Sequence, residues 1–192
     1  MGNYRRSSVI TPLLALGLLL AVMVGPSVVT PGSAGASPPQ ATPAATSAAS
    51  SVTDFTTFYG WVDNSPPSAA IAHPCIHRSA GGTGTYADPV TFAERIDLNG
   101  PWCQIIYVPF LKKYFIHEDQ CKPCGGVKLN HVDLWMGGDA ASKRQPEKRA
   151  LLGCEGTWTG HNTVILDPPS TEPVDTTPLF TPPATCHGGT GD

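Results

Sequence analysis

Residues 130–138 combine side chains suited to acid–base chemistry with a pattern typical of a strand that ends in a glycine turn. Polar or aromatic and apolar residues alternate along this segment, which predicts that His131, Asp133 and Trp135 share one face of a strand. The apolar residues between them then face a core. An acid, an imidazole and an indole on one face can bind a sugar and transfer a proton. An ordinary edge strand with a solvent-exposed polar face gives the same pattern.

Aromatic residues in the segment 57–61 are candidates for carbohydrate contact. Tyr59 and Trp61 carry flat rings, and such rings pair with the apolar faces of pyranoses. A tyrosine in a first strand serves equally well as a core residue. We therefore treat both side chains as candidate substrate-binding residues.

The chain has six cysteines, an even number that favours disulfides in an oxidising compartment. Cys121 and Cys124 lie between His117 and His131, so a zinc site of thiolates and imidazoles is the alternative. A redox centre is not expected, because no helical pattern follows the Cys-x-x-Cys pair to lower a thiol pKa. We predict structural disulfides with no free thiol, and neither a metal nor a cofactor.

The elements that must position these residues are short and strand-like. Several segments are rich in β-branched and aromatic residues or alternate in polarity, and glycine and proline separate nearly all of them. No amphipathic run is long enough to predict a substantial helix. The predicted class is all-β, in a small closed barrel that avoids open edges. The expected strands are 53–59, 90–93, 104–108, 114–117, 131–136 and 163–166.

The two ends of the chain suggest export and a single folded domain. Residues 1–36 combine early arginines, an apolar run and small residues, which is typical of a secretory signal peptide. Residues 37–52 form a Pro/Ala/Ser/Thr linker that cannot bury enough apolar surface to order. The domain is predicted at 53–166, and a proline-rich tail at 167–192 is stapled back by Cys186. The mature protein is therefore expected to be secreted and not membrane-bound.

Charge excludes one class of partner. The formal net charge is −3 and the basic residues are scattered, whereas a nucleic-acid surface needs a concentrated basic face. We expect a monomer that binds no nucleic acid.

Several of these segments resemble known families. The stretch Thr57-Phe58-Tyr59-Gly60, followed by Asp63, resembles the opening of an expansin domain, and His131-Val132-Asp133-Leu134 resembles its later strand. The later strand is also similar to the segment that carries the catalytic acid of family 45 glycoside hydrolases. A strand ending in Tyr107-Val108-Pro109, then an acidic strand, is similar to the three-aspartate barrel of lytic transglycosylases. These families share the six-stranded double-psi β-barrel, which the resemblance therefore implies here.

The resemblance also implies roles for three carboxylates. Asp133 matches the proton-donating or wall-loosening aspartate, and Asp119 matches the first acidic position of the transglycosylase pattern. Asp119 is as readily a hydrogen-bond partner of loop amides. Asp63 follows Tyr59 at the expansin-like interval rather than at the shorter interval of the hydrolase base, so we treat it as a candidate substrate-binding residue. The tail is too short for the second, polysaccharide-binding domain of expansins.

Three functions remain open on this reading. The first is a single-domain, expansin-like protein that binds and loosens a cell-wall polysaccharide, be it cellulose, chitin, glucan or peptidoglycan. The second is a glycan-cleaving enzyme, either endoglucanase-like or a lytic transglycosylase, with Asp133 as the acid. The third is a defence or inhibitor protein whose barrel displays loops to a protein partner.

Overall fold

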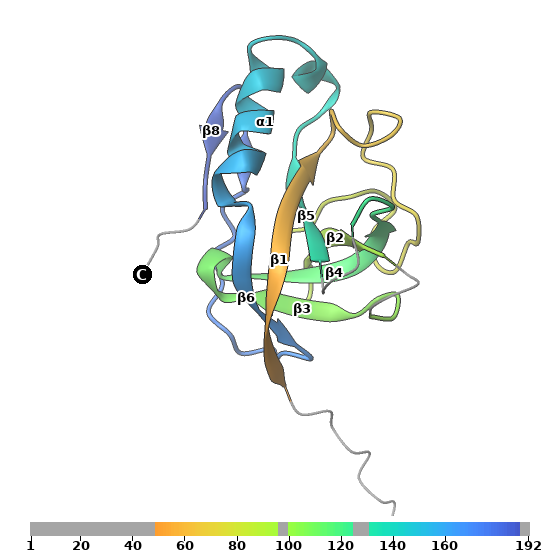
Figure 1. Ribbon diagram of the computed structural model, residues 1–192, viewed down its shortest axis with the longest axis vertical. Coiled ribbons are helices and arrows are strands. Elements are labelled where there is room, and N and C mark those ends of the chain that lie inside the picture. The colour runs from red at the N-terminus through yellow and green to blue at the C-terminus, as the bar shows by residue number, and fades with distance from the viewer. Residues whose placement is uncertain (1–48, 96–99, 125–130, 189–192) are drawn as a thin grey trace, which may run out of the picture. The chain divides into compact units, whose positions relative to one another are not determined.

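The computed structural model describes residues 49–95, 100–124 and 131–188, and its centre is a closed six-stranded barrel. The strands follow the order β1-β5-β2-β4-β3-β6 around the barrel (Figure 1). This confirms the all-β barrel, and each expected strand is present with small shifts of its ends. The strands are β1 (Ser50–Gly60), β2 (Val90–Glu94), β3 (Ile105–Val108), β4 (Lys113–Gln120), β5 (His131–Gly137) and β6 (Gly160–Leu166).

Strand pairing is mixed, and it brings distant parts of the sequence together. The β1–β5 and β2–β4 pairs are parallel, whereas the other four pairs in the barrel are antiparallel. In the parallel β1–β5 ladder, Thr57 lies opposite Asp133 and Tyr59 lies opposite Trp135. Strand β2 runs between β4 and β5, so Ala93 pairs with Asp119 on one side and Asp133 on the other.

Apolar side chains from all six strands fill the barrel. Val108, Phe115 and Leu134 are fully buried and Val132 is 3% exposed, which confirms the residues predicted for the core. Phe92 and Val164 are also fully buried. Closure of the sheet leaves no long edge for pairing with another chain.

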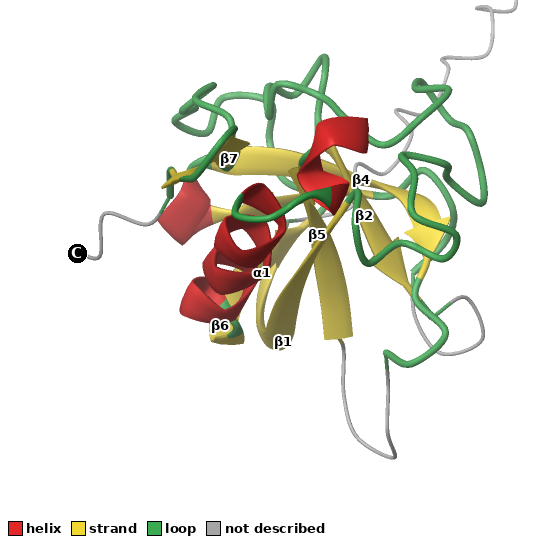
Figure 2. Cartoon of the chain, turned by 90° about the horizontal axis from the view of Figure 1, so that it is seen from above, coloured by secondary structure: helices red, strands yellow, loops and turns green. Residues whose placement is uncertain are grey.

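The expectation of no substantial helix was wrong. Helix α1 (Glu147–Trp158) lies alongside β1 (Figure 2), and two short 3-10 turns, η1 (Pro109–Leu111) and η2 (Ala140–Lys143), accompany the barrel. The helical pattern is weak because Gly153 and Gly156 interrupt it and only Leu151, Cys154 and Glu155 are buried. Packing against β1 and a disulfide hold the helix, and intrinsic propensity contributes little.

All six cysteines form disulfides, which confirms that there is no free thiol. The pairs are Cys75–Cys103, Cys121–Cys124 and Cys154–Cys186. The last pair ties α1 to a small hairpin of β7 (Phe180–Thr181) and β8 (Thr185–Cys186), so the proline-rich segment returns to the domain.

The domain boundaries need one correction. Strand β1 starts at Ser50, because residues 50–56 pair with β6, so the folded part begins before the predicted position 53. The predicted signal peptide at 1–36 and most of the linker lie outside the described residues. Among the residues that the structure describes, no helix is long and apolar enough to cross a membrane.

Candidate functional site

A groove of about 430 Å³ opens where β1, β2, β4 and β5 meet. Its walls include Tyr59 from β1, Asp119 from the end of β4 and Asp133 from β5, together with Asp63 and Cys121 from the loops that follow β1 and β4. Three of the carboxylates singled out in the sequence therefore line one hollow. The roles assigned to them stay predictions.

A small residue creates the space between two of these carboxylates. Ala93 of β2 also lines the groove and lies between Asp119 and Asp133 in the sheet. Neighbouring strands lie roughly 4.8 Å apart, so the two aspartates project from positions roughly two strand spacings apart. A larger side chain in place of Ala93 would fill the gap that separates them.

Asp133 is half-buried, and its environment favours the protonated acid. Burial raises the pKa of its carboxyl group to about 7, and the charges of Asp63 and Asp119 act in the same direction. The Thr57 hydroxyl donates a 2.7 Å hydrogen bond to Asp133 Oδ1, which opposes this shift by favouring the carboxylate. Near neutral pH, Asp133 is therefore able to give or accept a proton.

Thr57 also connects Asp133 to His131. Its Oγ1 lies 2.9 Å from His131 Nε2, in addition to its bond with the carboxylate. Burial lowers the pKa of His131, so this ring is neutral near pH 7. A hydroxyl group donates one hydrogen bond and accepts another. Rotation of the Thr57 hydroxyl therefore reverses the direction of both hydrogen bonds between His131 and Asp133. The three side chains can thus move a proton between the groove and the imidazole.

Asp119 is held more rigidly than Asp133. Its Oδ1 accepts hydrogen bonds from the backbone N–H groups of Ala72, at 3.1 Å, and Gln120, at 2.8 Å. Its Oδ2 accepts a 3.0 Å bond from the Tyr59 hydroxyl. Burial raises the pKa of Asp119 and, together with this carboxylate, raises that of Tyr59 well above its usual value. Asp119 is suited to orient Tyr59 and to repel negative charge on Asp133.

Glu155 of α1 is an acidic neighbour that the sequence did not reveal. Only 8% of it is exposed. Burial and the nearby Asp63 raise the pKa of its carboxyl group to about 9, so it is protonated at neutral pH and hydrogen-bonded to Asp63. Asp63 itself lies at the surface end of the groove, where its Oδ1 accepts a 2.7 Å bond from the Gly60 N–H. Glu155 was not predicted as a site residue because helix α1 was not predicted.

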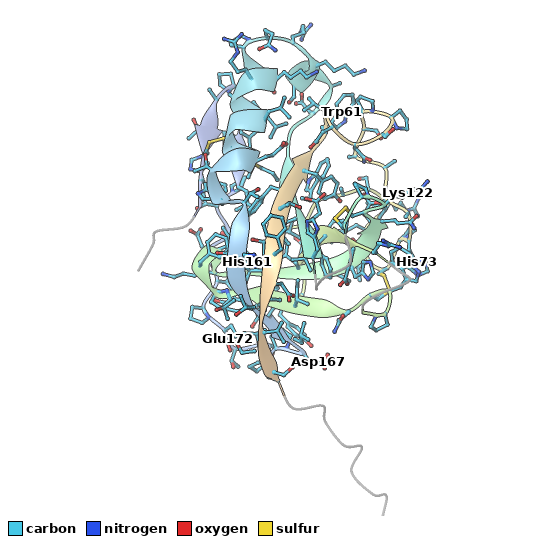
Figure 3. The ribbon with its side chains drawn as sticks, in the orientation of Figure 1. Trp61, His73, Lys122, His161, Asp167 and Glu172 are labelled. Carbon is cyan, nitrogen blue, oxygen red and sulfur yellow. A yellow bond between two sulfur atoms is a disulfide. The ribbon has the colours of Figure 1, made fainter. Side chains whose placement is uncertain are left out.

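The structure does not place the two tryptophans in the groove. Trp135 was expected beside Asp133, but it is 6% exposed and packs edge-on against Tyr59 with ring centroids 5.1 Å apart. Strand β5 is covered on both faces at this end, so Leu134, Trp135 and Met136 are buried in succession and the alternation stops. Trp61 lies just beyond β1 (Figure 3), where Lys143 Nζ sits 4.8 Å from its ring centroid. Neither ring offers the groove a stacking face.

The disulfide pairing contradicts the zinc alternative. Zinc binding requires thiolates, and the Cys121 and Cys124 sulfurs are joined to each other. His117 is fully buried, and its ring stacks on Phe92 and is tilted against Trp102. A second cysteine–histidine group, at the Cys75–Cys103 disulfide, is equally closed to metal.

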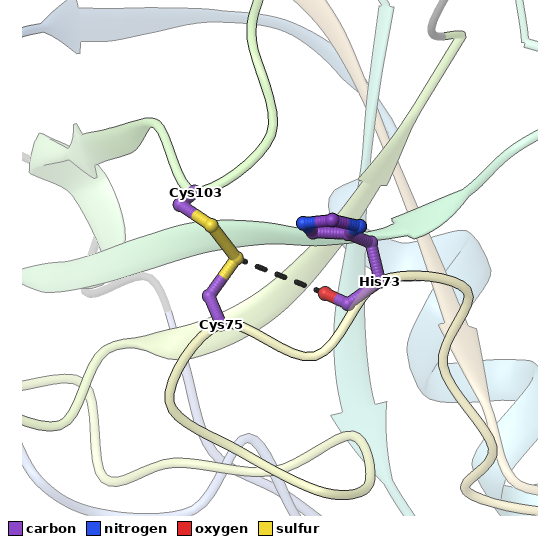
Figure 4. A group of neighbouring side chains, drawn as sticks. All are labelled: His73, Cys75 and Cys103. Atoms are coloured by element: carbon purple, nitrogen blue, oxygen red, sulfur yellow. Dashed lines mark hydrogen bonds between the residues drawn. A yellow bond between two sulfur atoms is a disulfide. The ribbon is translucent and has the colours of Figure 1, made fainter.

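Figure 4 shows that second group. His73 lies beside the Cys75–Cys103 disulfide, with its carbonyl oxygen 3.7 Å from Cys75 Sγ. A disulfide sulfur carries no hydrogen, so this approach is a contact and not a donated bond. We therefore assign the group a structural role in closing the loop over β4.

Comparison with known proteins identifies relatives without assigning an activity. The family model described as "DDB_G0273701 N-terminal domain" matches residues 51–187. The Dictyostelium discoideum protein named "Uncharacterized protein DDB_G0273701/DDB_G0273221" is 40% identical over 137 residues, which cover 67% of this chain and 56% of that protein. The match thus spans little more than half of the relative's length. No solved structure matches the chain.

Proposed function

As this chain belongs to the DDB_G0273701 N-terminal domain family, whose name states no activity, we propose its function from the groove itself. We propose that it is a secreted domain that binds a cell-wall polysaccharide in this groove and loosens it, with Asp133 as the acid. One observation carries the proposal: Asp133 faces the groove with a pKa of about 7 and without a cationic partner among the contacts that raise or lower it.

The chemistry follows from that protonation state. A neutral carboxyl group donates a hydrogen bond to a glycan oxygen, and its anion accepts one from a hydroxyl group. Alternation between the two forms near neutral pH allows Asp133 to exchange hydrogen bonds between a glycan chain and its neighbours. The hydrogen bonds from Thr57 to Asp133 and His131 provide a route by which the proton returns.

A second candidate is cleavage of the glycosidic bond by the same acid. An inverting hydrolase also needs a free base, with the two carboxyl groups roughly 6.5–9.5 Å apart. Asp119 lies on the other side of Ala93, but both of its oxygens already accept hydrogen bonds. A lytic transglycosylase requires no activated water, since a sugar hydroxyl closes the ring, so this geometry favours that reaction over hydrolysis.

Export is part of the proposal and has its own support. Three disulfides hold the domain, and disulfides persist in oxidising compartments. The predicted signal peptide agrees with that setting.

The test is binding to insoluble cellulose, chitin, glucan and peptidoglycan, with mass analysis of soluble products. We expect one polysaccharide to retain the protein, and Asp133→Asn to reduce loosening or product release by about 100-fold. The control is Asp167→Asn, which removes an exposed carboxylate outside the groove at a positive φ that asparagine tolerates.

The products separate the candidates. Binding without soluble products supports loosening, anhydro sugars support a transglycosylase, and reducing ends support a hydrolase. Unchanged activity in Asp133→Asn, or retention by a protein partner in place of every glycan, would contradict the proposal.

A further inference from the structure

The Cys121–Cys124 disulfide differs from the other two in its place and its span. Its cysteines are 3 positions apart, whereas the other pairs are separated by 28 and 32 positions. Such a small ring fixes little of the chain. Cys121 also lines the groove beside Asp133, as do Lys122 and Pro123. This disulfide therefore lies at the candidate active site and adds little as a staple.

The surroundings of the pair are suited to thiol chemistry. The Cys124 N–H donates a 3.1 Å hydrogen bond to Cys121 Sγ, and a donor in that position stabilises a thiolate. Lys122 is exposed between the two cysteines (Figure 3), where its cation favours an approaching or departing anion. The sequence argued against a redox centre because no helix N-terminus follows the pair to stabilise a thiolate. The Cys124 N–H and the Lys122 cation can supply that stabilisation instead.

Asp133 completes the arrangement. One of its carboxylate oxygens and the sulfurs of Cys121 and Cys124 all lie within 4.8 Å of one another. A group that can accept or donate a proton thus lies beside both sulfurs, and hydrogen bonds link it to Thr57 and His131.

We propose that Cys121–Cys124 is a redox-active disulfide that oxidises a thiol substrate entering the groove, with Asp133 supplying the proton to the departing sulfur. In the first step, the thiolate of the substrate attacks the sulfur of Cys121, the cysteine that lines the groove. A substrate–Cys121 disulfide forms, the Cys121–Cys124 bond breaks, and the electron pair leaves on Cys124, which takes the proton of Asp133.

The second step releases the product. A second substrate thiol loses its proton to the Asp133 carboxylate, and its sulfur attacks the substrate sulfur of the mixed disulfide. The substrate disulfide leaves, and Cys121 departs as a thiolate that the Cys124 N–H stabilises until Asp133 protonates it. The proton that the first thiol releases to solvent on forming its thiolate returns to Asp133 at the end of the cycle. Two thiols are thus oxidised to one disulfide and the protein disulfide is reduced to two thiols, so protons and electrons balance.

This proposal does not rest on polysaccharide binding, and its test contains no glycan. The purified protein is exposed to increasing dithiothreitol, free thiols are alkylated, and the modified cysteines are mapped by peptide mass analysis. We expect Cys121 and Cys124 to be labelled at least about tenfold faster than the other four cysteines, because Asp133 and the Cys124 N–H lie beside this pair and assist its opening. Exposure alone would favour the other pairs, since Cys121 and Cys124 are buried whereas Cys103 and Cys186 are exposed. Equal rates for all three pairs would overturn the proposal.

Turnover gives a second readout. The protein should accelerate the reduction of insulin disulfides by dithiothreitol. Reduced glutathione and a reduced, unfolded protein should then each be tested as the thiol substrate, which distinguishes small from macromolecular partners. The Cys121→Ala/Cys124→Ala variant should lose this acceleration, whereas Cys75→Ala/Cys103→Ala should keep it. If the control variant does not fold, the selective labelling of the native protein still decides the matter.

The role of Asp133 is read from the pH profile. In the native protein, the opening rate of the disulfide should change slope near pH 7, where Asp133 titrates. Asp133→Asn should slow opening by about tenfold or more and remove that inflection. A reduced protein that retains one zinc ion and catalyses no exchange would show instead that Cys121, Cys124 and Asp133 form a metal site, which would overturn the redox assignment.

Discussion

Asp133 owes its chemistry to residues that are remote in sequence and adjacent in the barrel. Its nearest polar partner, Thr57, is 76 positions away and reaches it through the parallel β1–β5 ladder. Alternation in residues 131–136 was enough to suggest that Asp133 leaves the core. It did not reveal Thr57 or Glu155, because strand register and a weakly patterned helix bring these groups to the site.

Thr57→Val tests the relay at the level of one hydroxyl group. Loss of the hydrogen bond to Asp133 Oδ1 removes an interaction that favours the carboxylate, so the pKa of Asp133 should rise further. A ¹³C NMR titration of the carboxyl carbon measures this directly. Activity that needs the protonated acid should then persist to higher pH, although the link to His131 is broken.

Thr57→Ser is the matched control for that experiment. It keeps the hydroxyl group and should leave the titration of Asp133 near that of the native protein. An unchanged pKa in the valine variant would show that the Thr57 bond does not influence the acid.

At the scale of elements, six strands were predictable and one helix was not. Alternation and β-branched residues identify strands one by one, whereas the parallel pairing of β1 with β5 depends on chain closure. Helix α1 is held by burial of Leu151 and Cys154 and by the Cys154–Cys186 disulfide, none of which a periodicity argument weighs. The acid that α1 delivers, Glu155, was lost with it.

The weakness of α1 makes a stabilising prediction. A methyl group at Gly153 or Gly156 would meet nothing within 4 Å, so alanine at each site should raise the free energy of unfolding by about 0.5–1 kcal/mol. Denaturant unfolding measures the change.

Gly138→Ala is the contrasting variant. Gly138 has a φ of +86°, and a methyl group there would lie 2.8 Å from a Leu151 side-chain carbon. This variant should lose stability. A gain at Gly138, or losses at both helix positions, would contradict the helix packing described above.

At the scale of the whole molecule, acidic groups whose pKa values are shifted in opposite directions set how stability depends on pH. Glu118 is fully buried and its Oε1 accepts three backbone N–H bonds, while its Oε2 accepts from Thr91 and lies 2.7 Å from His77 Nδ1. Despite the cost of burial, these bonds lower the pKa of Glu118. Its contribution to stability is therefore present above the unfolded-state pKa and is lost as the pH falls through the folded-state value.

Asp133 and Glu155 act in the opposite sense. Their folded-state pKa values, about 7 and about 9, lie above the values in an unfolded chain. At any pH between the unfolded-state and folded-state pKa of each group, the folded protein therefore binds more protons than the unfolded chain. Stability should therefore decline as the pH rises from weakly acidic values toward 9. Together with Glu118, this predicts a maximum in weakly acidic solution.

Glu155→Gln isolates the alkaline side of that curve. The amide keeps the shape of the protonated acid and can still donate a hydrogen bond to Asp63, but it cannot be forced to ionise. The variant should match the native protein near pH 5 and exceed its free energy of unfolding at pH 9 by on the order of 1–3 kcal/mol. Thermal melts at pH 5, 7 and 9 measure the difference, with Glu172→Gln on the proline-rich segment as the control. Parallel curves for the native protein and Glu155→Gln would mean that Glu155 is already ionised in the fold, and the proton it shares with Asp63 would then have to be assigned elsewhere in the groove.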